Sequence, residues 1–252
     1  MGKVFIVTGG AVGIGFELVK MLYEKNGTVY IATRSREKIS RAINQIQQVH
    51  PTSHGKMMPL KFLASETRLD VLFHNASVTA TSVGSKSAQG HELQMATNDL
   101  AHITQHGPKS PTDRVRIVWV SSMVGLGTPQ GGIVWDEKAK QLTLLPDTLD
   151  NYMQSKVGMV FLAHNFAQRL GKEGVLSMGA VMKGPKNGAY TEIFAGYSPE
   201  VKTENNGAFI IPWGRMGSLP DHVAAGVKSK TKGGTGASET FWDWCEGAVK
   251  VF

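Results

Sequence analysis

The feature that most constrains this chain is a glycine-rich turn near its N-terminus, with the sequence TGGAVGIG at residues 8–15. An apolar, β-branched run, KVFIVT at 3–8, precedes it, and an amphipathic pattern, FELVKMLYEK at 16–25, follows it. A strand buried on both faces has a continuous apolar run, whereas a helix has apolar residues three and four positions apart. Between a strand and a helix N-terminus, such glycines permit the backbone to approach a phosphate group. We therefore predict a phosphate-binding turn rather than an ordinary glycine-rich loop.

The alternation of strand and helix continues along the chain. A second strand is expected at 28–33, followed by a second helix at 35–49 with Ser35 as its N-cap. Further strands are expected at 57–62, 69–74, 115–121, 175–181 and 208–212, and a long helix at 150–171. This alternation predicts a parallel sheet with right-handed crossovers. No linker or repeat divides the sequence, so we expect an α/β fold in one domain over 1–252. It should be a Rossmann-type, doubly wound parallel sheet with helices on both faces.

Composition narrows the class of protein. The 252 residues, 41% of them hydrophobic, suffice for a sizeable core. The formal charge of +7 is spread along the chain instead of being concentrated with aromatic residues, so we expect no nucleic-acid binding. The single cysteine, Cys245, excludes an internal disulfide and suits a reducing compartment. No apolar run approaches the roughly 18 residues of a membrane span, and we expect a cytoplasmic protein with no membrane span.

The residues after the second strand indicate which dinucleotide would bind. A dinucleotide site reads the adenosine ribose about twenty residues beyond the glycine turn, and an acidic residue there favours NAD. This chain has ATRSREK at 32–38, with Arg34 and Ser35 at that position and no carboxylate before Glu37. A guanidinium suits a 2′-phosphate, so the sequence favours NADP(H) over NAD. The alternative is an exposed arginine at a strand end.

A tyrosine and a lysine stand one helical turn apart in YMQSK, residues 152–156. A free tyrosine has a pKa of about 10, too high for easy proton exchange near neutrality. A cation on the same helix face would lower the pKa of Tyr152. Tyr152 and Lys156 are therefore candidates for acid–base chemistry, and the alternative is a pair on the protein surface.

Four features in a fixed order resemble the short-chain dehydrogenase/reductase family. They are the T-G-x-x-x-G-x-G turn, HNA at 74–76, VSS at 120–122, and YMQSK at the start of a long helix. Two later stretches, GAYTEIFAG at 188–196 and NGAFIIPWGRMGS at 206–218, are similar to its retinol-dehydrogenase-like and protochlorophyllide-reductase-like branch, particularly fungal members. The resemblance covers nearly the whole chain.

The resemblance implies a role for individual residues. Tyr152 would be the acid/base, and Lys156 would lower its pKa and hold the nicotinamide ribose. Ser122 would bond the substrate oxygen, and Asn98 would anchor a proton-relay water. The positions implied to bind the cofactor are Thr8, Gly9, Gly13, Ile14, Gly15, Arg34, Ser35, Asn75, Ala76, Tyr152 and Lys156.

The sequence departs from the family's pattern in three places that look like internal deletions. Only residues 63–68 separate the third and fourth expected strands, although a parallel crossover needs about a dozen residues. The interval from Asn98 to Val115 is short for the long helix expected there, and no Pro-Gly turn or lid follows the strand at 175–181. Ser77 replaces a glycine common in the family. An alternative transcript or an imperfect gene model would produce such gaps.

The function expected from these observations is that of an NADP(H)-dependent oxidoreductase. It would interconvert an alcohol and a carbonyl on a largely apolar small molecule. The alternative is a cofactor-binding or structural relative that has lost turnover, which the three gaps favour. His102 and His106 have i, i+4 spacing but lack the glutamate of a zinc helix and a third ligand, so we expect no metal site. Assembly into a homo-oligomer is left open.

Overall fold

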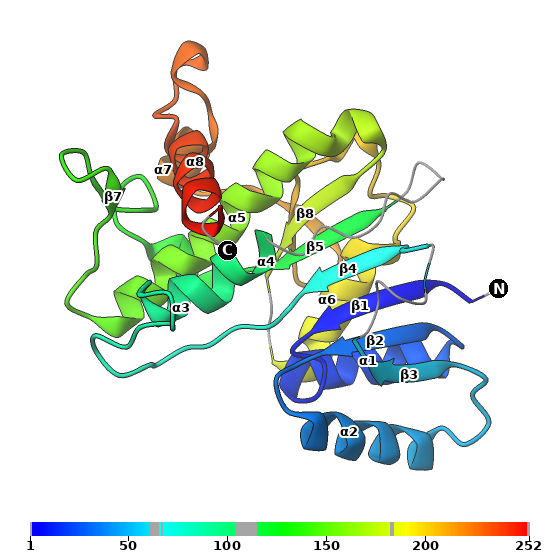
Figure 1. Cartoon of the computed structure of the whole chain (residues 1–252). Helices are drawn as coiled ribbons and strands as arrows, with labels where there is room; N and C mark the ends of the chain where they lie inside the picture. Colours follow the sequence, from blue (N-terminus) through cyan, green and yellow to red (C-terminus); the bar gives the residue numbers. More distant parts are fainter. Residues whose placement is uncertain (1, 61–65, 67, 104–114, 182–183, 251–252) are drawn as a thin grey trace.

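The computed structural model describes residues 2–60, 66, 68–103, 115–181 and 184–250 (Figure 1). Within these residues, eight strands form one sheet in the order β10-β9-β8-β5-β4-β1-β2-β3. Neighbouring strands are parallel, except that β10 runs antiparallel to β9. The strands are β1 (Val4–Thr8), β2 (Thr28–Ala32), β3 (Lys56–Pro59), β4 (Val71–His74), β5 (Arg116–Val120), β8 (Leu176–Ala180), β9 (Phe209–Ile211) and β10 (Arg215–Gly217). A separate hairpin pairs β6 (Trp135–Asp136) with β7 (Gln141–Leu142).

Helices cover both faces of the sheet (Figure 1). One face packs against α1 (Gly13–Glu24), α2 (Arg36–Val49) and α6 (Pro185–Tyr197). The other face packs against α5 (Thr148–Leu170) and α8 (Ala237–Val249), together with the short α3 (Leu93–Met95) and α4 (Ala101–Ile103). A π-helical segment, Ala96–Leu100, joins α3 to α4, and α7 (Asp221–Val227) precedes α8. This arrangement confirms the expected α/β class with a mostly parallel, helix-flanked sheet.

Local sequence accounts for most of these elements. Every residue of β1 is buried, as its apolar run predicts for a central strand. Ser35 caps α2 as expected, since its Oγ accepts a hydrogen bond from Lys38 N at 3.2 Å. The long helix α5 begins after Asp147, whose Oδ1 accepts a bond from Leu149 N at 2.7 Å, and it ends at Gly171. These caps define where the helices that carry the candidate site begin and end.

The connection between β3 and β4 is short in the structure, as it is in the sequence. β3 lies at the sheet edge, and the chain must pass β2 and β1 to reach β4. Part of this connection, 61–65 and 67, lies outside the described residues. Its described ends supply Leu60 and Leu69 to a small apolar cluster on the sheet, while Tyr30 Oη donates a hydrogen bond to Glu66 Oε1 at 2.7 Å. Side chains from a short connection therefore contribute to covering this part of the sheet.

The other two shortened places also border described elements. α4 ends at Ile103, and residues 104–114, which include His106, lie outside the described residues. α6 begins at Pro185, shortly after β8, and residues 182–183 lie outside the described residues as well.

Among the helices that the structure describes, none combines the length and apolar character that a membrane span requires.

Candidate active site

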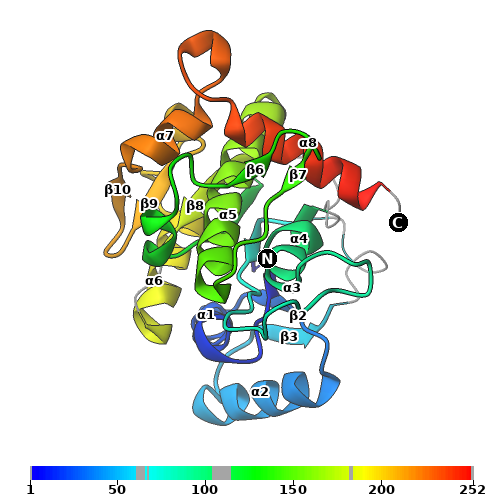
Figure 2. The same cartoon turned by 90° about the vertical axis from the view of Figure 1, so that its left-hand side faces the viewer.

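The candidate site lies at the carboxyl edge of the sheet, which faces the viewer in Figure 2. β1, β4 and β5 are adjacent and parallel, with Val7 paired to Phe73 and His74 paired to Trp119. The three segments that follow these strands therefore emerge side by side. They carry the glycine turn, the HNA motif and Ser122, respectively. Ligands of open α/β sheets bind at this edge.

The glycine turn has the shape of a phosphate cradle. Gly9 and Gly13 have φ of +68° and +57°, a region that favours glycine. A Cβ on Gly15 would lie 2.5 Å from Asn75 Nδ2 and 2.6 Å from Gly9 O, so this position admits no side chain. A Cβ on Gly13 would meet nothing within 4 Å. Gly9 and Gly15 thus close the turn, while Gly13 borders open space at the N-terminus of α1. Ile14 packs beside Gly188 of α6.

Thr8 joins the turn to the segment after β4. Its Oγ1 donates to Phe73 O at 3.2 Å and accepts from Asn75 N at 2.9 Å and Ala76 N at 2.8 Å. The Asn75 amide donates back to Thr8 O at 2.9 Å. These bonds use the Thr8 hydroxyl as donor and acceptor and fix the Asn75 amide nitrogen, so both residues hold the wall of the cleft in place.

Arg34 and Ser35 stand between the end of β2 and the start of α2. Arg34 is exposed, and none of the ion pairs found among the described residues involves it. The Ser35 hydroxyl is used as the N-cap of α2. An uncommitted guanidinium beside a helix N-terminus favours an anion, because the helix dipole and the cation attract the same charge.

Lys156 is buried on α5 beside Tyr152. Its Nζ donates to Val120 O at 2.9 Å and lies 5.6 Å from the centroid of the Tyr152 ring. Burial lowers the pKa of Lys156 to about 8, while the nearby Asp99 and Glu192 carboxyls oppose that shift. The ammonium is therefore directed to the end of β5 and to the ring of Tyr152.

The pKa of Tyr152 differs from the sequence-based expectation. Burial raises the pKa of Tyr152, and hydrogen bonding with the hydroxyls of Ser122 and Ser77 partly lowers it. The expectation that Lys156 lowers this pKa is not met in the structure, because desolvation outweighs the other influences and the ammonium is bonded to Val120. Ser77 was not among the predicted site residues. The signal in the sequence that could have pointed to Ser77 is that a serine stands here where the family commonly has a glycine.

Asn98 is fully buried within the π-helical segment, a type of distortion that is frequent at functional sites. Its Oδ1 accepts from Val78 N at 2.8 Å, and its Nδ2 donates to Val78 O at 3.1 Å and to Ser155 Oγ at 2.9 Å. The Asn98 amide is therefore a clamp between the segment after β4 and α5. The relay water expected at this residue stays a prediction.

Several buried ionisable groups surround this clamp. His102 Nε2 lies 3.1 Å from Ala76 O and therefore acts as the donor, and burial lowers the pKa of His102 to about 4. Burial raises the pKa of the Asp99 and Glu192 carboxyls well above their usual range. Among the described residues, no three His, Cys, Asp or Glu side chains are grouped so that they could hold a metal ion.

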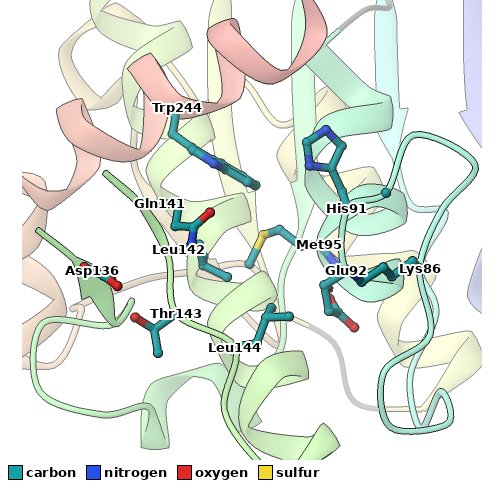
Figure 3. A pocket seen from close by; sticks show the side chains of 11 residues that line it. Lys86, His91, Glu92, Met95, Asp136, Gln141, Leu142, Thr143, Leu144 and Trp244 are labelled. Atoms are coloured by element: carbon teal, nitrogen blue, oxygen red, sulfur yellow. Dashed lines mark hydrogen bonds between the residues drawn. The ribbon is translucent and has the colours of Figure 1, made fainter. Parts of the chain in front are cut away.

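A cavity of about 500 Å³ lies apart from these residues, between the segment that leads into α3, the β6–β7 hairpin and α8 (Figure 3). The His91 and Trp244 rings approach edge to face there, with centroids 6.0 Å apart, and Met95 and Leu142 also line it. No predicted site residue lines this cavity. The candidate site is thus the carboxyl edge rather than this cavity.

Comparison with known proteins gives four findings. A family model described as "short chain dehydrogenase" matches residues 3–135. The Short-chain dehydrogenase/reductase iacJ of Pestalotiopsis fici is 36% identical, over 99% of this chain and 90% of that protein. An uncharacterised protein from Mycobacterium paratuberculosis has a similar fold, with a TM-score of 0.69 and 19% identity, over 98% of this chain and 93% of that one. So has an NADPH-bound short chain oxidoreductase from Pseudomonas aeruginosa PAO1, with a TM-score of 0.61 and 17% identity, over 87% and 97% of the two chains.

The alignment with the Pestalotiopsis protein also bears on the gaps. It runs over 304 positions, whereas this chain has 252 residues, so at least 52 aligned positions carry no residue of this chain. Because the alignment includes nearly the whole chain, these positions fall within it. They agree with the internal deletions that the sequence indicates.

Proposed function

This chain belongs to the short-chain dehydrogenase/reductase family, and from that premise we propose that it is an NADP(H)-dependent oxidoreductase that interconverts an alcohol and a carbonyl on a largely apolar small molecule. The narrower retinol-dehydrogenase-like branch remains a prediction, as does the single-domain division. The single observation that carries the proposal is the meeting of Tyr152, Lys156 and Ser122 with the open glycine turn at one edge of the sheet.

The turn fits a dinucleotide. Open space at Gly13 would receive the pyrophosphate against the N-terminus of α1. Gly9 and Gly15 allow the backbone of the turn to come close to that pyrophosphate. When bound, the cofactor supplies hydride transfer, so the chain must supply orientation and proton traffic. Asn75 and Ala76, fixed by Thr8, would form part of the wall of the cofactor cleft.

In the reduction direction, Tyr152 would give its hydroxyl proton to the substrate oxygen. The O–H bond of Tyr152 breaks as an O–H bond forms on the substrate. Ser122 would donate a hydrogen bond to the same substrate oxygen and orient it. Lys156, anchored on Val120 O, places a positive charge near the Tyr152 ring and would hold the cofactor ribose.

NADP(H) is proposed over NAD because Arg34 is an exposed guanidinium with no acidic residue beside it before Glu37. The Pseudomonas aeruginosa structure, which shares this fold, has NADPH bound, and another with this fold, a metagenomic short-chain oxidoreductase, is in complex with NADP. An apolar substrate is proposed because Met123 and Val124, directly after Ser122, are 50% and 44% exposed.

We also propose a cytoplasmic location, which a single buried cysteine suits. Members of this family act on small molecules, and assembly into a homo-oligomer stays open.

The rival function is cofactor binding without turnover. The specific observation in its favour is that at least 52 aligned positions of the relative have no residue in this chain. One of the gaps expected from the sequence follows the strand at 175–181, where the family resemblance implies a lid over the substrate. Without a lid, the substrate is held less firmly and water is excluded less well. Parent turnover should therefore be weak.

The experiment is a panel of apolar aldehydes and ketones assayed by NADPH consumption, with the parent protein beside Tyr152→Phe. We expect slow reduction by the parent and a further loss of about 10²–10⁴-fold in Tyr152→Phe, the usual worth of a positioned acid. NADPH affinity and thermal stability should be the same in both proteins. Equal turnover in the two proteins would refute the mechanism, and NADPH binding without any turnover would favour the rival.

A further inference from the structure

Two adjacent serines, Ser121 and Ser122, follow β5, and they form different contacts. Ser121 is buried, its backbone N donates to Ala180 O of β8 at 2.7 Å, and its Oγ donates to Lys156 O at 2.6 Å. Ser122 is partly exposed, and its backbone is extended, with φ of −147° and ψ of 148°. Successive side chains of an extended chain point to opposite sides. Ser121 therefore binds α5, while Ser122 is left for the candidate site.

The end of β5 contacts Lys156 at both ends of that residue. The backbone O of Lys156 accepts from Ser121 Oγ, and its Nζ donates to Val120 O at 2.9 Å. A Cβ on Gly125 would lie 3.0 Å from Lys156 Cβ, so the turn Met123–Gly127 passes directly over the lysine side chain. Lys156 is thus held at its carbonyl, along its stem and at its ammonium.

The bond from Ser121 matters because a lysine side chain is long and has many rotamers. Lys156 is only 2% exposed, and its Nζ lies 5.6 Å from the centroid of the Tyr152 ring. The Nζ atom reaches Val120 O only when the Lys156 backbone lies at a fixed distance from β5. Ser121 sets this distance, since it is the chain neighbour of Val120 and binds the Lys156 carbonyl.

We propose that Ser121 is a positioning residue for Lys156: by binding the Lys156 carbonyl, it fixes α5 on the end of β5, so that the ammonium lies beside Tyr152 and can hold the cofactor ribose. This inference rests on the proposed function. Ser121 touches neither substrate nor cofactor in this scheme and acts only through Lys156. The two serines after β5 then have separate roles, Ser122 at the substrate oxygen and Ser121 at the lysine.

The test is a double-mutant cycle on the whole protein, with NADPH affinity measured by fluorescence titration. Its four members are the parent, Ser121→Ala, Lys156→Ala and the double variant. Ser121→Ala should weaken NADPH binding about fivefold in the parent, the order of one hydrogen bond. In the Lys156→Ala background it should have almost no effect, because the residue through which Ser121 acts has lost its ammonium. An equal loss in both backgrounds overturns the inference, since Ser121 would then act on the fold in general.

Two further variants separate the hydroxyl from the burial of the residue. Ser121→Thr keeps the hydroxyl and should retain the parent's NADPH affinity. Ser177→Ala is the matched control, because Ser177 is a buried serine on the neighbouring strand β8 whose Oγ accepts from Trp119 Nε1 at 2.9 Å. It should lower thermal stability and leave NADPH affinity unchanged. A loss of affinity in Ser177→Ala as large as in Ser121→Ala would count against a specific role of Ser121.

A measurement without cofactor distinguishes the failure of this inference from the failure of the proposed function. In protein containing ¹³Cε-labelled lysine, the Lys156 resonance is assigned by its loss in Lys156→Ala. We expect this resonance to move in Ser121→Ala and to stay in place in Ser177→Ala. An unmoved resonance in folded Ser121→Ala overturns the inference. A moved resonance in a protein that does not bind NADPH supports the contact and refutes the proposed function instead.

Discussion

The carboxyl edge of the sheet and the core directly behind it differ in how their polar groups are satisfied. At the edge, the side chains of Thr8, Asn75 and Asn98 all form hydrogen bonds that hold the cleft. In the core, Asp99 and Glu192 are fully buried, and neither carboxyl has a hydrogen-bond partner among the residues that the structure describes. Asn98 and Asp99 are adjacent in sequence, yet one is completely engaged and the other is not.

At the edge, the hydrogen bonds fix the positions of the candidate site residues, whereas in the core the buried carboxyls are unfavourable for stability. A satisfied buried network fixes one geometry, whereas an unpartnered buried carboxyl is costly to ionise. The two carboxyls accordingly have raised pKa values because of burial. Glu192 lies in α6, which starts soon after β8, and Asp99 lies in the π-helical segment that precedes α4. The edge carries the candidate site, and in the core behind it the ionisation of the two buried carboxyls would lower the stability of the fold.

The largest effect is expected from a change that destroys the cradle at the edge. Gly13→Val should lower the affinity for NADPH and NADH more than about 100-fold, because a branched side chain at φ +57° is strained and would fill the open space of the turn. Fluorescence titration of both cofactors measures this. Gly247→Val, a glycine of α8 with open space around it, is the control. Undiminished affinity in folded Gly13→Val would place the cofactor elsewhere.

A smaller effect is expected from a change at Arg34, which tests the preference for NADPH and leaves the glycine turn intact. Arg34→Asp should weaken NADPH binding by about 1–3 kcal/mol and leave NADH nearly unchanged, because only NADPH loses a charge-assisted bond. Lys172→Asp, remote from this edge on the turn after α5, controls for the change in net charge. Equal losses for the two cofactors would remove Arg34 from the 2′-phosphate site.

The smallest effect is expected from replacing a buried carboxyl of the core, Glu192. A carboxyl with a raised folded-state pKa contributes stability fully below its unfolded pKa, near 4, and that stability is lost as pH rises toward the folded value. Glu192→Gln removes this loss, so the variant should gain about 1–3 kcal/mol over the parent at pH 8 and little at pH 4. Urea unfolding at the two pH values measures it, with the exposed Glu204→Gln as control. A pH-independent difference would mean that Glu192 is not held protonated.

Much of the edge could be predicted from sequence, because it is built from local patterns. Buried strands have continuous apolar runs, so β1 and β5 were expected close to their observed bounds. Ser35 is recognisable as an N-cap by its place before a helical pattern. The strand β10 was missed, because RMG is three residues long and mostly exposed and therefore has no apolar signature. The β6–β7 hairpin was missed for the same reason of length.

The interactions between distant segments could not be predicted. The spacing of Tyr152 and Lys156 suggested a lowered tyrosine pKa, but spacing carries no information on burial, which dominates in the structure. The hydrogen bonds of the Asn98 amide depend on a π-helical segment that no sequence pattern predicted. Ser77 stands where the family commonly has a glycine, but its influence on the pKa of Tyr152 becomes apparent only in the fold.

The carboxyl edge is assembled in a chain that lacks at least 52 aligned positions of its relative. The most direct measurement is a titration of the unmodified protein with NADPH and NADH, followed by fluorescence and by thermal shift. We expect saturable binding of both cofactors, tighter for NADPH, with a rise in melting temperature that grows with cofactor concentration. A folded protein that binds neither cofactor would contradict it.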